Sequence, residues 1–328
     1  ITMRSNQIII GAILCLIAAI SWGAMFPVAE RALVHIDPFY FSFIRYGSVS
    51  ILLIIWLIAK EGIQALRLEG KGLPLWFFGT MAFTVYNFFV FLGQNSLGKP
   101  GVILASIMEA MIPLIAVLIL WVFKHQRPAK FTFACIAVAF IGVFMVITKG
   151  DLSFFSDAGK APLWVLVIFF GEVGWAVYTL GCDSDTFADW SPLRYSTLSC
   201  ILGSITAGII VTMMTGIGYL DAPTMETLFI IKWEMAFMIL VAGLIALISW
   251  NIGIKYLNSI NGSLFINFVP VTTFVITVIQ GYQITLFDII GTLLIIMALV
   301  SNNLYQRKML TQKLSVSTER VPVKSKAV

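Results

Sequence analysis

Three charged side chains lie deep inside long apolar stretches of this sequence: Arg45, Glu109 and Glu172. A charge in hydrocarbon costs about 3 kcal/mol or more unless it is paired or hydrated, so such residues usually serve a function. For Arg45 and Glu109 two interpretations stay open, a structural ion pair or a role of Glu109 in binding a substrate or a proton. Glu172 has no evident partner at its depth. This favours either proton carriage or a protonated packing residue.

Amide and aromatic side chains occur in the same apolar stretches. An asparagine in hydrocarbon needs a hydrogen-bond partner from another helix or from a ligand. Aromatic faces can stack on apolar or cationic solutes, although they can equally pack inside a helix bundle. A site that binds a small amphipathic solute with an amine is therefore expected from these candidates, taken together: Trp22, Tyr86, Asn87, Glu109, Glu172, Trp175, Trp250, Asn251 and Asn267.

The residue types argue against catalysis. No histidine lies in an apolar stretch, and the sequence contains neither an HExxH motif nor a phosphate-binding GxxxxGK[ST] loop. The four cysteines are scattered and form no CxxC pair. We therefore predict no catalytic residue, no metal site, no cofactor and no drive by ATP. A solute carrier is the leading interpretation, with a channel or a membrane enzyme as the less favoured alternatives.

The elements that must position these side chains follow from composition. The chain has 328 residues, of which 59% are hydrophobic and only 11% charged. Soluble domains are about 25% charged, so a soluble protein is excluded. About 20 apolar residues cross a hydrocarbon layer. Ten nearly charge-free runs therefore predict an all-α integral membrane protein with ten transmembrane helices, over 8–29, 38–59, 73–97, 101–123, 131–148, 161–181, 193–214, 234–254, 258–281 and 286–305.

Positive charge predicts the orientation of these helices. With the N-terminus inside, 14 of the 21 lysines and arginines fall on the cytoplasmic side and five on the other. This bias favours a multi-pass protein of the cell membrane with both termini cytoplasmic. Residues 307–328 read as a basic, flexible tail near lipid headgroups, so the positive charge indicates lipid contact and not nucleic acid.

The two halves of the chain resemble each other. At an offset of 157, Pro113 aligns with Pro270, and at 153 Trp22 aligns with Trp175. Five spans per half is an odd number, so the second half must enter the membrane inverted. We predict two five-helix repeats, residues 1–150 and 151–306. The matched prolines predict a hinge or a static kink in each repeat.

The order of several short segments resembles the EamA branch of the drug/metabolite transporter superfamily. The segments are Ser21-Trp22-Gly23, Pro38 to Arg45, Ala105-Ser106 with Pro113, Ser249-Trp250-Asn251, and Ser263 with Pro270. The resemblance implies ten helices in two inverted repeats and secondary active transport by alternating access. The expected cargo is a small organic solute such as an amino acid or related metabolite, with export the expected direction. Multidrug or organic-cation export on the same fold is the alternative. A proton is a candidate coupling ion, and the oligomeric state stays open.

Overall fold

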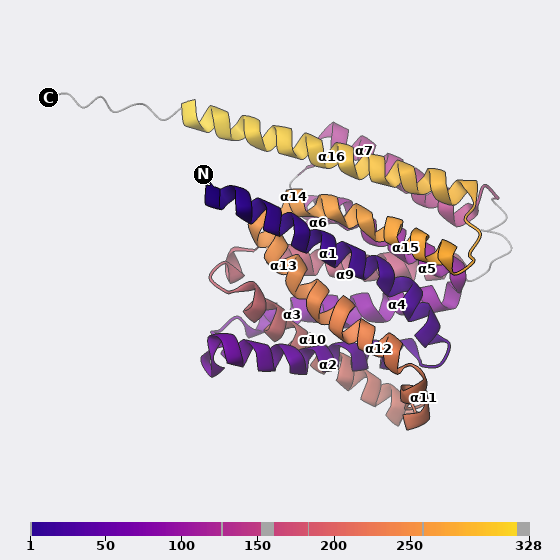
Figure 1. Cartoon of the computed structure of the whole chain (residues 1–328). Helices are drawn as coiled ribbons and strands as arrows, with labels where there is room; N and C mark the ends of the chain where they lie inside the picture. The colour runs from indigo at the N-terminus through magenta and orange to yellow at the C-terminus, as the bar shows by residue number, and fades with distance from the viewer. Residues whose placement is uncertain (1, 126, 152–160, 183, 258, 320–328) are drawn as a thin grey trace.

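The computed structural model describes residues 2–125, 127–151, 161–182, 184–257 and 259–319 (Figure 1). Every regular element within these ranges is a helix. Eight helices are long and apolar enough to cross a membrane. They are α1 (Thr2–Leu33), α2 (Pro38–Glu61), α3 to α4 (Gly72–Leu97), α7 (Lys130–Thr148), α9 (Ala161–Cys182), α10 (Pro192–Gly216), α12 to α13 (Lys232–Leu257) and α16 (Leu286–Glu319).

The two remaining predicted runs are interrupted helices. The run 101–123 is α5 (Lys99–Ala110) followed by α6 (Ile112–Lys124), and the chain bends by 54° between them. Pro113 lies in the first turn of α6, where a missing N–H is tolerated, so the proline begins the second segment. The run 258–281 is α14 (Ser259–Gly262), the 3₁₀ turn η5 (Ser263–Asn267) and α15 (Phe268–Ile279), with Pro270 near the start of α15.

Two long spans contain a wider, π-helical turn in their interior. The first is η2 (Met81–Tyr86), between α3 (Gly72–Thr80) and α4 (Asn87–Leu97). The second is η4 (Leu240–Ile245), between α12 (Lys232–Ile239) and α13 (Ala246–Leu257). A π turn interrupts the regular backbone ladder and is frequent at functional sites. The two turns lie at similar distances from the beginnings of their spans.

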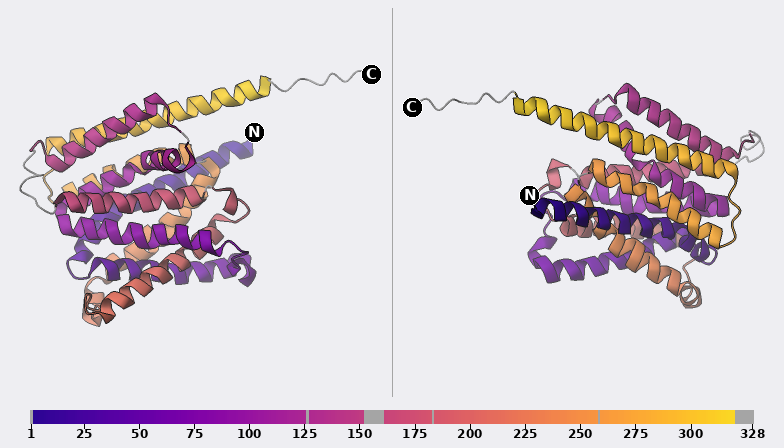
Figure 2. Two further views of the ribbon diagram at one scale, coloured as in Figure 1. Left: turned by 180° about the vertical axis from the view of Figure 1, so that it is seen from behind. Right: turned by 45° about the horizontal axis from the view of Figure 1, so that its top comes forward.

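Each helix of the first half packs on a helix of the second half. α1 packs on α13 and α15, while α9 packs on α4 and α6. α2 pairs with α10 and α7 with α16, and these two pairs lie on opposite sides of the bundle (Figures 1 and 2). Small residues allow these close approaches. A Cβ atom on Gly203 would lie 2.2 Å from the carbonyl oxygen of Gly79, so α10 and α3 touch backbone to backbone.

The C-terminal helix is longer than the sequence predicted. α16 continues to Glu319, beyond the end of the bundle (Figure 1). The first part of the predicted tail, residues 307–319, is therefore helical, and residues 320–328 lie outside the described part of the chain. The junction between the predicted repeats, residues 152–160, also lies outside it.

Candidate functional site

Three tryptophans from three different helices meet at the centre of the bundle. The ring of Trp22 on α1 lies 5.5 Å from that of Trp175 on α9, edge to face, and 5.3 Å from that of Trp250 on α13. All three side chains are at most 4% exposed. Helices from both halves therefore bring together the three tryptophans that the sequence singled out.

Further aromatic rings extend this cluster around Trp175. Tyr86 lies 5.1 Å from its ring, Tyr178 5.2 Å and Phe83 6.4 Å. Tyr86 was predicted, whereas Phe83 was not. Nothing in the sequence distinguishes Phe83 from the many other phenylalanines of the apolar runs, and only the packing of the helices selects it.

Two buried carboxyl groups lie at this cluster in different surroundings. Glu109 on α5 is 2% exposed and accepts a hydrogen bond of 3.1 Å from the hydroxyl of Tyr86. Glu172 on α9 is fully buried, and neither of its oxygens has a hydrogen-bond partner among the described residues. The indole nitrogen of Trp175, three residues along the same helix, also lacks one. Buried polar groups without partners are rare, so these two groups are candidates for contact with a ligand or a proton.

Arg45 is fully buried but forms no ion pair with Glu109 or with any other described carboxylate. Its Nε donates to the carbonyl oxygen of Met238 at 3.1 Å and its Nη2 to that of Ala242 at 2.9 Å. Its Nη1 donates to Oδ1 of Asn87 at 3.3 Å. Of the two interpretations left open by the sequence, the direct ion pair is not formed in this structure.

The three predicted asparagines form hydrogen bonds within the protein. Asn87 is buried and donates to the carbonyl oxygen of Ala82 at 2.8 Å. Asn251 on α13 donates to the hydroxyl of Ser196 on α10 at 2.5 Å. Asn267 donates to the carbonyl oxygen of Leu264 at 2.9 Å, while its own Oδ1 has no partner in the described residues. Asn87 and Asn251 thus hold helices together, and Asn267 keeps one free acceptor.

A second polar cluster joins the two halves at the face of the bundle where α2 ends. We call it the loop network, and it consists of Glu61, Glu69, Lys71, Asp189, Trp190, Ser191 and Arg194. Nη2 of Arg194 lies 2.9 Å from Glu69 Oε1, and Nζ of Lys71 lies 2.6 Å from Asp189 Oδ1. Trp190 donates to Glu69 at 3.1 Å, and its ring lies beneath the Arg194 guanidinium at 4.3 Å. This network was not predictable from the sequence, because its charges are ordinary loop residues.

Hydrogen bonds in the loop network shift two carboxyl groups. The bond from Arg194, with a smaller contribution from Trp190, lowers the pKa of Glu69. The bond from Lys71 lowers the pKa of Asp189. Both carboxyl groups are therefore held in their charged form.

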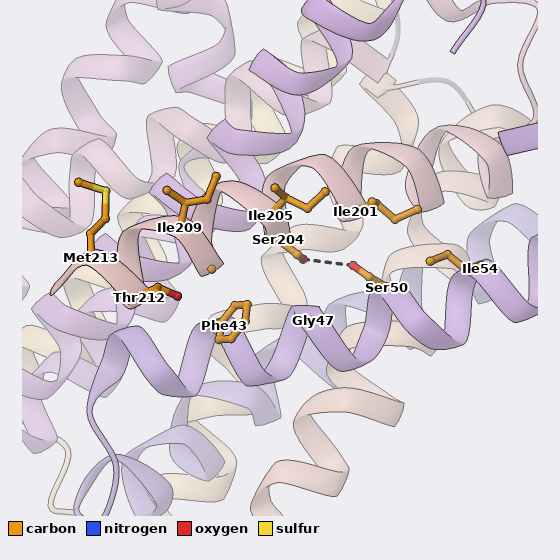
Figure 3. Close-up of a pocket in the computed structure, with 11 residues that line it drawn as sticks. Phe43, Gly47, Ser50, Ile54, Ile201, Ser204, Ile205, Ile209, Thr212 and Met213 are labelled. Carbon is orange, nitrogen blue, oxygen red and sulfur yellow. Dashed lines mark hydrogen bonds between the residues drawn. The ribbon is translucent and has the colours of Figure 1, made fainter. Parts of the chain in front are cut away.

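A groove of about 560 Å³ lies between α2 and α10, apart from the central cluster (Figure 3). Its walls are mostly apolar, and Ser50 and Ser204 meet across it at 3.1 Å. Residues of both helices line it, including Phe43, Gly47, Ser50, Ser204, Gly208 and Met213. None of them was predicted as a site residue. Because both helices can span a membrane, the apolar walls are suited to contact with hydrocarbon.

The central cluster has the chemistry of a binding site. Aromatic faces and two carboxyl groups can hold a cationic amine and an attached apolar group, and the free indole N–H of Trp175 can donate to an acceptor on the same solute. Within the described residues no group of three or more His, Cys, Asp or Glu side chains could hold a metal ion.

Comparison with known proteins identifies a family model and relatives that match most of the chain. The sequence model of the EamA-like transporter family matches the chain twice, over residues 9–148 and 162–304. The chain is 53% identical to "Uncharacterized transporter YrdR" of Bacillus subtilis (strain 168) over 93% of its own length and 95% of that protein. It is 27% identical to "Uncharacterized transporter YyaM" of the same organism, over 85% of this chain and 88% of that one.

A solved structure shares the fold. The protein, titled only "Crystal structure of protein", aligns with a TM-score of 0.64 over 91% of this chain and 98% of its own, at 18% sequence identity. Such a likeness concerns the arrangement of the helices alone.

Proposed function

Because the chain belongs to the EamA-like transporter family, we propose that it is a secondary active transporter that carries a small organic solute across the cell membrane by alternating access. Export is the proposed direction, with both termini in the cytoplasm. The carriers of this type hold one central site that opens to one side of the membrane at a time.

The internal repeat supports this mechanism. The family model matches each half separately. The contacts between the halves are also symmetric, because α1 of the first half packs on α13 of the second, and α9 of the second half packs on α4 of the first. Each half also has one span with an interior π turn. We therefore propose ten spans in two inverted repeats, residues 1–150 and 151–306, with Pro113 and Pro270 at the bending points.

The observation that carries the proposed site is the pair of unpartnered groups on α9. The Glu172 carboxyl and the Trp175 indole nitrogen are buried without partners, beside rings of both halves. We propose that a solute amine binds at Glu172 and Glu109, against Trp22, Tyr86, Trp175 and Trp250. Asn87, Asn251 and Asn267 then form the walls of the site.

Charge balance supports coupling to protons. The central region holds one guanidinium, that of Arg45, and two carboxyl groups, those of Glu109 and Glu172. Net charge in a low-dielectric interior is costly, so one positive charge must accompany the second carboxylate. A proton or a cationic amine supplies it, which suits exchange of one for the other. A metabolite with an amine, such as an amino acid, is our first candidate. The excess of carboxyl groups favours an organic cation as the second.

The test is tracer counterflow in proteoliposomes with a panel of amino acids, other amines and organic cations. We expect saturable counterflow for members of one of these classes, and uptake driven by an imposed pH gradient. Glu172→Gln should abolish the gradient-driven component and weaken counterflow without abolishing it, because Glu109 still offers a carboxylate to the amine. Glu69→Gln, at the exposed loop network, is the matched control and should keep both.

Several outcomes would count against the proposal. Unsaturable flux would indicate a channel, and unchanged gradient-driven uptake in both Glu172→Gln and Glu109→Gln would exclude proton coupling through these residues. For the topology, single cysteines placed at Lys99 and Lys232 should react with an impermeant reagent from outside the cell. Labelling from the cytoplasm alone would reject the proposed orientation.

A further inference from the structure

A chain of buried hydrogen bonds links the π turn of the first half to that of the second. Nδ2 of Asn87 donates to the carbonyl oxygen of Ala82, the second residue of η2. Oδ1 of the same amide accepts from Arg45 Nη1. Arg45 Nη2 then donates to the carbonyl oxygen of Ala242, the third residue of η4. We call this chain, Ala82–Asn87–Arg45–Ala242, the π relay.

The π turns explain why these carbonyl oxygens can accept side-chain donors. In a regular helix each carbonyl oxygen is paired with an N–H four residues on. The wider turn disturbs this ladder, and side chains can then satisfy the backbone groups that it releases. The Ala242 oxygen takes two such donors, Arg45 at 2.9 Å and the indole nitrogen of Trp22 at 3.1 Å. The second half of the relay therefore also touches the central aromatic cluster.

No carboxylate lies at ion-pair distance from Arg45 among the described residues. The contacts of Arg45 within the described residues are dipoles and rings: two carbonyl oxygens, one amide oxygen, and the rings of Tyr46 at 4.6 Å and Phe91 at 5.8 Å. A carboxylate would hold the guanidinium in place by charge alone. Here the position of the guanidinium depends on the backbone conformation of the two interrupted helices, so a change in either helix changes the environment of the guanidinium.

We propose that Arg45 is a positioning residue that couples the two π turns, so that η2 and η4 change conformation together. The guanidinium is planar and presents several donors in fixed directions, which allows it to bind Met238, Ala242 and Asn87 at once. A lysine keeps the charge but has a single ammonium group and cannot span the same three acceptors. The coupling would make a change in one half accompany a change in the other, as the proposed alternating access requires.

Hydrogen–deuterium exchange on the full-length protein in lipid nanodiscs tests the coupling without any solute. In Arg45→Lys we expect amide exchange to rise about tenfold in both segments, 81–87 and 238–246, since each loses a buried hydrogen-bond partner. Arg194→Lys, at the loop network, is the matched control and should leave both segments unchanged. A rise confined to 238–246 in Arg45→Lys would overturn the proposal.

A second variant breaks the π relay at Asn87. Asn87→Leu removes the bond to Ala82 and one anchor of Arg45, and exchange should rise in the distant segment 238–246 as well as in 81–87. Adding Arg45→Lys to Asn87→Leu should then raise exchange in 81–87 no further, because coupled sites are not additive. Unchanged exchange in 238–246, or full additivity in 81–87, would refute the coupling. The role of the coupling in transport rests on the proposed function, whereas the coupling itself does not. Failure of transport with intact coupling would reject the function and leave the relay.

Discussion

Two of the polar regions between the halves of the molecule differ in how their charges are neutralised. In the central region Arg45 and Glu172 are fully buried and have no partner of opposite charge at ion-pair distance among the described residues. In the loop network, Arg194 and Lys71 each have a carboxylate, at 2.9 Å and 2.6 Å. The Glu69 side chain is 46% exposed and that of Asp189 64% exposed.

The difference follows from the cost of each arrangement. Exposed ion pairs form readily but contribute little, because water and salt screen them. Unpaired charge in a buried site is expensive, and a chain that keeps it must gain something other than stability. The central region is therefore the candidate for function, and the loop network for holding one arrangement of the two halves. Mutations in the two regions should change the free energy of unfolding by different amounts and, for the carboxyl groups, in opposite directions.

The largest effect is expected at the centre of the aromatic cluster. Trp175→Ala removes a ring that contacts Trp22, Tyr86 and Tyr178, and should lower the free energy of unfolding by about 3–5 kcal/mol. Trp76→Ala is the control: that ring is 45% exposed and donates a single bond to Thr206. Thermal unfolding in one detergent compares the two. Equal losses would show that the centre is not the better-packed region.

Removing the charge of a carboxyl group should raise the stability of the fold in the central region and lower it in the loop network. Glu172→Gln removes a potential charge that has no partner, so we expect the free energy of unfolding to rise by about 1 kcal/mol. Glu69→Gln weakens bonds from Arg194 and Trp190 and should lower the melting temperature. Melting curves at neutral pH measure both variants. A melting temperature lowered as much by Glu172→Gln as by Glu69→Gln would remove the contrast.

Hydropathy in the sequence was enough to locate the helices, but not their interruptions. Eight of the ten predicted runs are long helices, because continuous apolar runs in lipid must satisfy their backbone internally. Pro113 indicated the break between α5 and α6, since proline cannot continue the backbone ladder. The π turns η2 and η4 contain neither proline nor an unusual motif, and tertiary packing alone reveals them.

The candidate site, too, could be predicted only in part from the sequence. Trp22, Trp175 and Trp250 could be predicted to meet, because their depth and the repeat place them near one axis. The partners of Arg45 could not be predicted. Two of them are carbonyl oxygens, which every residue has, and the sequence gives no sign of which ones a π turn makes available.

The loop network should lose its contribution to stability in acid. The pKa values of Glu69 and Asp189 are lowered in the folded protein, so the network stabilises the fold above the ordinary carboxyl pKa of about 4. This contribution is lost as pH falls through the lower, folded-state values. The difference in melting temperature between the wild type and Glu69→Gln/Asp189→Asn should therefore be constant near neutral pH and vanish in acid. A difference that persists at the acid end would place the stabilisation elsewhere.

The smallest effect is expected from the more exposed of the two ion pairs in the loop network. Lys71→Met breaks the contact with Asp189, whose side chain is 64% exposed, and a longer contact of 5.1 Å with the ring of Trp190, so little stability should be lost. Arg194→Met should cost more, because Arg194 also donates to the carbonyl oxygen of Arg67 at 2.6 Å and covers the ring of Trp190. Melting curves at low salt and at about 1 M salt, where the screening length is about 3 Å, distinguish the two contributions. The Lys71→Met difference should nearly disappear at high salt, because most of it comes from an exposed ion pair. The Arg194→Met difference should persist, because the hydrogen bond to the Arg67 carbonyl oxygen and the closer ring contact of 4.3 Å remain in salt. Loss of both differences at high salt would mean that charge alone holds the loops together.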